Sequence, residues 1–196
     1  MTQFIFNTPT HFFALLRKIY SRIRLGIFLK KCGKRSYILF PFRINYPSTI
    51  ELGNNTVINS NSWLFSCGNS AIIKIGDNTQ IGHYFHCVSM NRVEVDEGVL
   101  IADRVFVSDC THDYTDIKKS VIKSDLKSLK KVKIGQGTWI GEGACIIGCS
   151  IGQHSVIGSN AVVTSDIPEY SVAVGVPAKV IKKYDFECNQ WVRVEG

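Results

Sequence analysis

The first fifty residues of this chain contain no aspartate and no glutamate, although they hold nine of its 23 lysines and arginines. The remaining 146 residues carry 14 basic and 16 acidic residues, so the formal net charge of +7 resides in the N-terminal segment. Strong basicity invites a nucleic-acid interpretation, but no helix-turn-helix, zinc-finger or RNA-recognition pattern accompanies it. We therefore expect a near-neutral main body with a basic appendage and no nucleic-acid partner.

The cysteines lack the patterns that bind metal or build a disulfide framework. Their number, seven, is odd, and no CxxC pair occurs. No apolar run reaches the length of a membrane span, and the N-terminus does not show the order of a secretory signal. A hydrophobic content of 45% is ordinary for a globular chain of 196 residues, which makes one domain or one domain with an appendage. These absences predict a reduced, cytoplasmic protein without a metal.

The basic appendage, residues 1–35, is expected to contain an amphipathic helix over 10–31. Its apolar stripe follows three-to-four spacing, while Lys18, Arg22 and Lys30 fall away from it. Such a helix packs on the main body or on a neighbouring subunit, or it lies on an anionic membrane surface with its basic side chains toward the headgroups. The stripe consists of Phe12, Leu16, Ile19, Ile23 and Ile27.

A six-residue repeat of apolar positions fills the main body, residues 36–167. Glycine often follows the apolar residue, and one step, from Ile146 to Ile151, spans five residues. A period of six fits short strands joined by tight turns, in which Gly, Asn and Asp supply the unusual backbone angles. Hexapeptide periods predict an all-β solenoid, a parallel β-helix of about five coils. The fifteen inward positions are Leu52, Ile58, Leu64, Ile75, Ile81, Cys87, Val95, Ile101, Val107, Ile134, Ile140, Ile146, Ile151, Ile157 and Val163.

A lysine-rich insertion interrupts the repeat over residues 113–131. It carries six lysines and three aspartates and follows His112 directly. Loops of this length in a compact fold are usually functional or disordered, so we expect an extruded loop that acts as a lid. Residues 168–196 are expected to form a C-terminal cap and tail.

The segment "VKIGQGTWIGEGACIIGCSIGQHSVIGSNAVVTSDIPEYSVAVGVPAKVIK", residues 132–182, resembles the hexapeptide-repeat acetyltransferases. The basic N-terminus is similar to the branch that O-acetylates bacterial surface polysaccharides. The resemblance implies a left-handed β-helix, a homotrimer with active sites at the subunit interfaces, and acetyl-CoA as donor. The family usually has a longer, Pro-Gly-containing step where this chain runs from Ile146 to Ser150, so one corner should differ.

His112 is the candidate general base. A sugar hydroxyl is barely ionised at neutral pH, and histidine titrates closest to that pH. Its position at the end of a hexad, immediately before the loop, matches the catalytic histidine of the family. A second group should orient the imidazole, and Asp109, Asp113, Asp116 or a backbone carbonyl could do so. Asp109 is our choice, so His112 and Asp109 form the expected catalytic pair.

The donor site is assigned by the resemblance. The backbone at Gly141 and Glu142, following Trp139, would stabilise the oxyanion, because a glycine corner lets the thioester approach closely. The residues that would bind the cofactor are Trp139, Ser159 and Thr164 along the pantetheine arm, with Lys179, Lys182 and Lys183 at the nucleotide phosphates.

The acceptor side is less defined. His86 and Asn91 lie one coil before His112, and Tyr84 and His83 are further candidates to bind the sugar. The galactoside enzymes place an asparagine where this chain has Gly82, so the acceptor pocket should differ from theirs. Cys110 raises the alternative of a covalent thiolate nucleophile, although cysteine also serves as a small apolar residue in tight coils.

Several functions compete on this scaffold. A zinc hydratase of the gamma carbonic anhydrase type needs three histidines, two of them five apart, and that spacing is missing. A non-catalytic solenoid would not need His112 or "GVPAK". The sequence thus predicts an acetyl-CoA-dependent O-acetyltransferase acting on a sugar hydroxyl of a surface polysaccharide or its precursor, in the cytoplasm and peripheral to the inner membrane. The alternative is an N-acetyltransferase of an amino sugar or a nucleotide-linked amino sugar.

Overall fold

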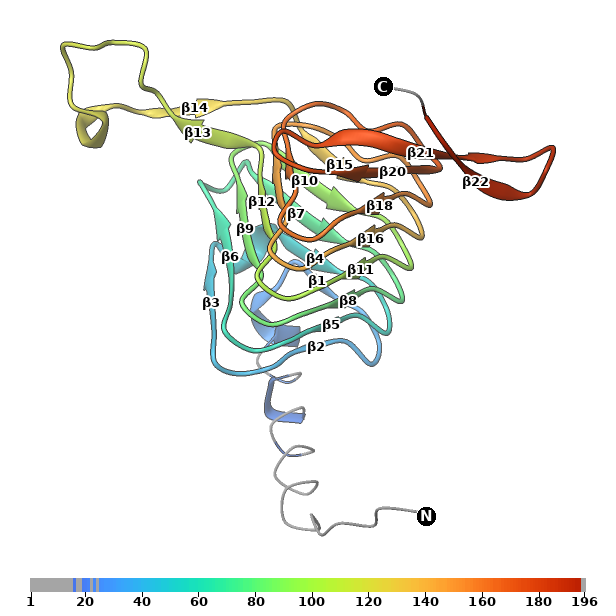
Figure 1. Cartoon of the computed structure of the whole chain (residues 1–196). Helices are drawn as coiled ribbons and strands as arrows, with labels where there is room; N and C mark the ends of the chain where they lie inside the picture. Colours follow the sequence, from blue (N-terminus) through green and yellow to red (C-terminus); the bar gives the residue numbers. More distant parts are fainter. Residues whose placement is uncertain (1–15, 17–18, 22, 24, 195–196) are drawn as a thin grey trace, which may run out of the picture.

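The computed structural model describes residues 16, 19–21, 23 and 25–194. Three parallel sheets form the faces of a prism around which the chain winds (Figure 1). We call them sheets A, B and C in the order in which each coil visits them, and we name each corner by the two sheets that it joins. This arrangement confirms the predicted parallel β-helix.

Most coils contribute one short strand to each sheet; the last two reach sheet A only by isolated bridges, and the last has no strand in sheet C. Hydrogen bonds join neighbouring coils. Sheet A contains β1 (Lys31–Cys32), β4 (Ile50–Leu52), β7 (Ile72–Ile75), β10 (Arg92–Val95) and β15 (Val132–Ile134). Sheet B contains β2 (Tyr37–Ile38), β5 (Val57–Ile58), β8 (Gln80–Ile81), β11 (Leu100–Ile101), β16 (Trp139–Ile140), β18 (Val156–Ile157), β20 (Ser171–Val174), β21 (Lys179–Asp185) and β22 (Gln190–Arg193). Sheet C contains β3 (Phe42–Asn45), β6 (Ser62–Ser66), β9 (His86–Ser89), β12 (Phe106–Ser108), β17 (Cys145–Ile147) and β19 (Val162–Val163).

The stack has more coils than the repeat predicts. Sheet A has five strands, and two isolated bridges, to Ile151 and Ile167, extend it to seven levels. The expected count of five is therefore corrected to seven. The first coil begins at Lys31, inside the segment assigned to the appendage, and the last includes β20, inside the segment assigned to the cap. Cys32 and Ala173 occupy inward positions there, and such small residues do not stand out as an apolar period.

The six-residue spacing holds along the faces and breaks at one corner. Within a coil the inward residues on sheets A, B and C are six apart, as in Ile75, Ile81 and Cys87. The return from sheet C to sheet A varies, from four residues between Val163 and Ile167 to 27 between Val107 and Ile134. Insertions at the C–A corner therefore leave the stack intact, and the loop with the candidate base leaves the prism there.

The inward residues form a continuous aliphatic core. Ile38, Ile58, Ile140 and Ile157 lie fully buried on sheet B alone, and each such side chain contributes about 1.5–3 kcal/mol by its burial. Glycine is required where coils approach most closely, since a Cβ on Gly76 would lie 2.6 Å from a backbone carbon of the next coil. The sequence rule that predicts buried positions is thus confirmed along the whole repeat.

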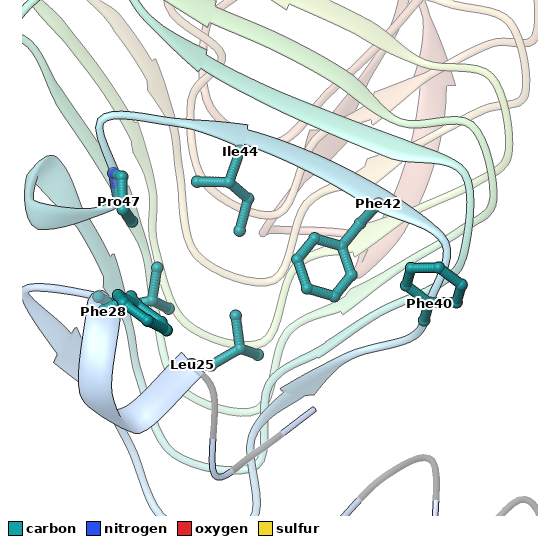
Figure 2. A pocket seen from close by; sticks show the side chains of 7 residues that line it. Leu25, Phe28, Phe40, Phe42, Ile44 and Pro47 are labelled. Atoms are coloured by element: carbon teal, nitrogen blue, oxygen red, sulfur yellow. The ribbon is translucent and has the colours of Figure 1, made fainter. Parts of the chain in front are cut away.

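The N-terminal helix covers the open end of the first coil. Residues 16, 19–21, 23 and 25–28 are helical, and the hydroxyl of Ser21 donates to the carbonyl of Ile38 at 2.5 Å. Leu25 and Leu29 join the core beneath β3, and an apolar pocket of about 420 Å³ remains between them and Phe42 (Figure 2). Phe12 and the remainder of 10–15 lie outside the described residues.

The face that the helix buries is not the predicted stripe. Ser21, Leu25 and Leu29 face the prism, whereas Ile23 and Ile27 are exposed, the latter by 70%. The helix therefore packs on the body of its own chain, as one of the alternatives predicted, but through a face other than the stripe.

Two hairpins project from the prism. β13 (Cys110–His112) and β14 (Leu126–Ser128) pair antiparallel at the base of the insertion, which extends away from the coils (Figure 1). β21 and β22 form the second, which continues sheet B beyond the last coil. Two short 3₁₀ helices, η1 (Pro47–Thr49) and η2 (Val121–Lys123), complete the described structure.

Candidate active site

His112 ends β13 at the base of the extruded hairpin. Backbone pairing with Leu126 fixes its position, and the adjacent amide of Asp113 donates to the carbonyl of Asp125 at 3.0 Å. The imidazole is exposed, and no hydrogen bond reaches it from the described residues. An accessible, uncommitted imidazole at a structurally fixed position can accept a proton from an incoming hydroxyl.

Asp109 does not orient His112. Its carboxylate is completely buried and accepts hydrogen bonds from the backbone amides of residues 90, 91 and 92 at 2.5–2.8 Å, and from the hydroxyl of Ser89 at 3.3 Å. These donors occupy the carboxylate, so the expected catalytic pairing is corrected: Asp109 holds the C–A turn of the preceding coil. Buried carboxylates need such donors, and the turn supplies them.

The other nearby aspartates are also engaged locally. Asp113 accepts from the amide and hydroxyl of Thr115, which lowers its pKa, and Asp116 accepts from the amide of Lys118. None of the three candidate aspartates therefore contacts the imidazole within the described part of the chain. The imidazole therefore has no orienting partner among the described residues.

A groove of about 460 Å³ runs between the hairpin and the following coils. Thr111 and Tyr114, on either side of His112, line one wall, and Thr164 lines the other. Thr164 is the residue expected to contact the donor's pantetheine arm. In the structure it lies across the groove from the strand that carries the candidate base. The groove is also lined by Leu129, Lys130, Ile147, Gly148, Cys149, Ser165 and Asp166.

The remaining donor-site candidates lie on sheet B and at the B–C corner, away from the C–A corner. Trp139 is half exposed on the outer face of sheet B, and Ser159 is exposed one coil above Gly141. Glu142 pairs with the guanidinium of Arg104. Within one chain Ser159 and Glu142 therefore lie at a different corner from His112.

The amide of Gly141 is not available to an oxyanion. It donates to the carbonyl of Ile157 at 2.8 Å, as part of the ladder between coils. A Cβ at this position would lie 2.6 Å from the backbone nitrogen of Ser159. Glycine is therefore needed here for coil stacking, which corrects the expected role of Gly141 and leaves Glu142 as the only candidate of that pair.

The predicted phosphate-binding lysines lie together on β21, above the column that contains Trp139. On the outer face of sheet B the register runs from Trp139 through Val156 and Val172 to Lys182. The register then continues to Arg193 on β22, a cation that the sequence analysis did not identify. Arg193 lies beyond the six-residue repeat, so its sequence position does not predict which residues it lies beside. The other two lysines, Lys179 and Lys183, pair with Val174 and Ser171.

His86 lies on the outer face of sheet C rather than in a polar pocket. Its ring stacks on Trp63 at 4.5 Å and tilts against Phe106 at 5.2 Å. Burial lowers its pKa, and neither its Nε2 atom nor the indole nitrogen of Trp63 has a hydrogen-bond partner among the described residues. An apolar face with two unsatisfied nitrogens is typical of a surface that another chain covers.

Of the other acceptor-side candidates, Asn91 and Tyr84 are separated, and His83 contacts the hydroxyl of Ser60 at 3.0 Å. Asn91 lies on the C–A corner and donates to the hydroxyl of Ser128, which ties the hairpin to the preceding coil. Tyr84 lies on the B–C corner, exposed and with φ of 57°, beside a groove that includes Trp63. The structure thus joins Asn91, but not Tyr84, to the edge that carries His112.

Cys110 is buried beside Ser108, whose hydroxyl lies 3.6 Å from the sulfur. The pKa of the nearby thiol of Cys67 is raised to about 12, first by burial and then by Cys110. Cys110 itself is only 6% exposed, so its sulfur is not presented to a ligand. Among the described residues no group of three or more His, Cys, Asp or Glu side chains could hold a metal ion. No helix of the described chain is long and apolar enough to cross a membrane.

Comparison with known proteins gives consistent relatives. The family model for the hexapeptide repeat of succinyl-transferase matches residues 131–165. WbbJ of Escherichia coli K12, named as a lipopolysaccharide biosynthesis O-acetyl transferase, is 36% identical over 172 residues, covering 84% of this chain and 86% of its own. The galactoside O-acetyltransferase of the same organism is 31% identical over 159 residues, covering 74% and 75%.

Solved structures share the fold at lower identity. A mutant of AntD, an N-acyltransferase from Bacillus cereus in complex with dTDP and coenzyme A, matches with a TM-score of 0.74 and 22% identity over 86% of this chain and 92% of its own. Galactoside acetyltransferase in complex with coenzyme A matches with a TM-score of 0.61 and 23% identity over 98% and 82%. The fold is thus the predicted left-handed parallel β-helix. The chain belongs to the hexapeptide-repeat acetyltransferase family and is an acyltransferase.

Proposed function

We propose that this chain is an acetyl-CoA-dependent O-acetyltransferase of a sugar hydroxyl in a surface polysaccharide or its precursor. The similarity to WbbJ over most of both chains supports this acceptor class. Coenzyme A in the galactoside acetyltransferase complex supports the donor. The observation that carries the mechanism is the exposed imidazole of His112, at the end of the strand whose residue Thr111 lines a groove together with Thr164.

In the proposed reaction His112 removes the proton of the acceptor hydroxyl as its oxygen attacks the thioester carbonyl. The new carbon–oxygen bond forms, the carbon–sulfur bond breaks, and the imidazolium returns its proton to the leaving thiolate. No acyl-enzyme is needed, in agreement with the buried position of Cys110. General-base assistance of this kind contributes about 100-fold or more to the rate.

A homotrimer would complete the site. The candidate residues occupy two edges of sheet C, and the face between these edges carries Trp63, His86 and Phe106. Packing this face against other copies would cover its apolar rings and bring the C–A edge of one subunit to the B–C edge of the next. Cyclic closure of such an interface gives a ring with equivalent sites.

The extruded loop serves as the lid in this assembly. Ile117 and Ile122 are 95% and 89% exposed at its end, and the loop extends away from its own coils (Figure 1). Isolated, fully exposed isoleucines beside lysines fit a contact that forms only with a second subunit. A loop that closes over a neighbouring site would also exclude water from the thioester.

The N-terminal helix is proposed to contact the inner membrane from the cytoplasmic side. Its exposed isoleucines, among them Ile19, Ile23 and Ile27, face away from the prism, and Leu25 and Phe28 of the same segment line the apolar pocket of Figure 2. Every charged residue among the first fifty is a lysine or an arginine. Such a surface suits an anionic bilayer that presents a lipid-linked acceptor.

The test is direct transfer. Purified protein is incubated with acetyl-CoA and a panel of sugars, nucleotide sugars and lipid-linked oligosaccharides, and the products are treated with mild alkali. We expect an acetylated saccharide from which alkali releases acetate, as an ester requires. An alkali-stable acetyl group would instead identify the N-acetylation of an amino sugar. Failure to transfer acetyl to any of these acceptors would contradict the proposal.

A further inference from the structure

An apolar pocket lies at the open end of the first coil, between the N-terminal helix and β3 (Figure 2). Its volume of about 420 Å³ is within the range of about 300–1,000 Å³ that is typical of small-ligand sites. Phe28 on the helix and Phe40 before β3 line the pocket, and they are 56% and 54% exposed. The other residues that line it are Leu25, Leu29, Phe42, Ile44 and Pro47. Every described residue of this lining is apolar, so the pocket suits a hydrocarbon group.

A second groove, of about 510 Å³, shares an aromatic wall with this pocket. Phe40 and Phe42, whose ring centroids lie 6.3 Å apart, line both spaces. The second groove differs in character because Arg43 lines it, with its guanidinium 5.9 Å from the centre of the Trp63 ring. Pro41, Asn61, Ser62 and Tyr84 complete its lining. An apolar space and a cationic, aromatic space thus adjoin at one wall.

The charge of Arg43 is not balanced by a neighbouring carboxylate. The side chain is exposed, and it takes part in no ion pair within the described part of the chain. Among the described residues that line the two spaces, none is acidic. Arginine binds phosphate through its planar fork of donors. A ligand that joins a hydrocarbon chain to a phosphate would therefore match both spaces at once.

We propose that the two spaces together bind the lipid end of a lipid-linked saccharide, with the hydrocarbon chain in the apolar pocket and the phosphate at Arg43. This inference rests on the proposed function, and it deepens that function by naming the form in which the acceptor arrives. A free sugar would leave the apolar pocket unused, and an uncharged hydrocarbon would leave Arg43 unused. Because the N-terminal helix forms one wall of the pocket, contact of that helix with a bilayer would bring the pocket to the bilayer surface.

The position of the second groove favours a saccharide beyond the phosphate. Tyr84, a candidate acceptor contact at the B–C corner, lines the same groove as Arg43. Backbone hydrogen bonds join the corner of Tyr84 to that of Arg104, and the corner of Arg104 to that of Gly143, next to the expected donor site. Two strand spacings, about 10 Å, therefore separate Tyr84 from that corner. A short saccharide can extend over this distance, whereas the headgroup of a phospholipid ends near the phosphate.

Isothermal titration calorimetry tests the two halves of the site separately. Farnesyl diphosphate carries an isoprenoid chain and a diphosphate, and farnesol carries the chain alone; both are used below their micelle concentrations and without an acetyl donor. Phe40→Gln should weaken both ligands by about tenfold, because each places its chain against that wall. Arg43→Gln should weaken farnesyl diphosphate by about tenfold and leave farnesol unchanged. Ile23→Gln, at an exposed position of the same helix outside the pocket lining, is the matched control and should change neither affinity.

Two further ligands distinguish the acceptor from a membrane phospholipid. Farnesyl diphosphate linked to maltose should bind about tenfold more tightly than dihexanoyl phosphatidylglycerol, which has a chain and a phosphate but no saccharide. Tighter binding of the phosphatidylglycerol would overturn the assignment to a lipid-linked saccharide.

The remaining outcomes separate this site from the proposed function. Undetectable binding of farnesyl diphosphate, or an affinity unchanged in both Phe40→Gln and Arg43→Gln, would overturn the inference while leaving acetyl transfer untouched. An equal loss in Ile23→Gln would also overturn it, because the chain would then lie on the helix surface. A second copy of the chain in the pocket would instead prevent binding, and Phe40→Gln would lower the mass in sedimentation velocity. Binding that depends on Phe40 and Arg43 in a protein that transfers no acetyl group would support the site and contradict the proposed function.

Discussion

At the scale of single residues, the neighbours of His112 have roles other than catalysis. The carboxylate of Asp109 accepts hydrogen bonds from the backbone amides of residues 90–92, and Cys110 is buried against Ser108. Only the imidazole is exposed and without a partner among the described residues. The chemistry attributed to this corner therefore rests on one side chain, and single substitutions can separate catalysis from support.

Replacing His112 with alanine should lower kcat by about 100-fold or more, because the acceptor hydroxyl loses its base. The dissociation constant for coenzyme A should stay nearly the same, since the donor is expected on the other edge of sheet C. Cys110→Ala is the comparison, and it should retain most of the activity. Normal turnover in the His112 variant, or an acetyl group trapped on Cys110, would refute the mechanism.

Replacing Asp109 with asparagine should lower the thermal midpoint by roughly 5–10 °C, because a buried carboxylate with four donors is lost. Any loss of kcat should be smaller than for His112→Ala. Differential scanning calorimetry and steady-state kinetics measure the two effects. An unchanged midpoint with a catalytic loss as large as that of His112→Ala would restore the orienting role to Asp109.

His86 should make stability depend on pH. Burial lowers its pKa in the folded protein, so the unfolded chain binds the proton more tightly. Stability is then fully present above the unfolded pKa of about 6.5 and is lost as the pH falls from there through the folded pKa. The uncharged rings of Trp63 and Phe106 pack against His86. The nearby charged group is the guanidinium of Arg43, which lies 5.9 Å from the centre of the Trp63 ring and stays positively charged throughout this pH range.

The measurement is the thermal midpoint between pH 7.5 and pH 5. The fall of the midpoint should be smaller in His86→Phe, which keeps an aromatic ring between Trp63 and Phe106. Identical slopes in the two proteins would show that His86 is not the group responsible.

The sequence identifies a functional residue well where its residue type and its position in the repeat are sufficient to select it. His112 could be selected because its residue type and its position before the insertion agree, but the partners of Asp109 could not. Those partners come from residues 89–92, one coil earlier, and only the register between coils brings them together. Gly141 was misread for the same reason, because its close neighbour belongs to the next coil.

At the scale of elements, the period determined the prism and its buried positions. The first and last coils were missed because Cys32 and Ala173 carry little hydrophobic signal. The helix was predicted, but its buried face was not. The hydroxyl of Ser21 donates a hydrogen bond to the carbonyl of Ile38. A polar contact of this kind cannot be predicted from the spacing of apolar residues.

The N-terminal helix should bind anionic liposomes in a salt-dependent way. Changing Ile19, Ile23 and Ile27 together to glutamine removes the exposed apolar surface while keeping Leu25 and Leu29 in the core. Co-sedimentation with vesicles containing phosphatidylglycerol should fall sharply in this variant, and also with added salt in the unmodified protein. Deleting residues 1–35 is a poorer test, since it would also remove β1 and part of the core.

If the exposed isoleucines instead contact a neighbouring subunit, the same triple variant gives a different result. The unmodified protein would then show no liposome binding, and the variant would dissociate at higher protein concentration in sedimentation velocity. That outcome would contradict membrane contact without affecting acetyl transfer.

At the scale of the whole molecule, no single chain holds a complete set of candidate residues. His112, Asn91 and Thr164 lie along the C–A edge, whereas Tyr84 and Ser159 lie along the B–C edge and Trp139 on the outer face of sheet B. A hexapeptide pattern reports which residues face inward but not which edges meet between chains, so this division could not be read from the sequence. A trimer would bring the two edges together and so complete the site. Sedimentation should therefore show a mass of about three times 21.9 kDa.

Mixed trimers test this claim most directly. His112→Ala disables the C–A edge, and Ser159→Trp, at an exposed corner, blocks the B–C edge, so each protein alone should be nearly inactive. Each variant keeps the edge that the other lacks. Unfolding and refolding the two together in equal amounts should restore about a quarter of the wild-type activity, because random assembly leaves one interface in four with both edges intact. Complete absence of recovery, with trimers confirmed by sedimentation, would mean that each site lies within one chain and would contradict the account.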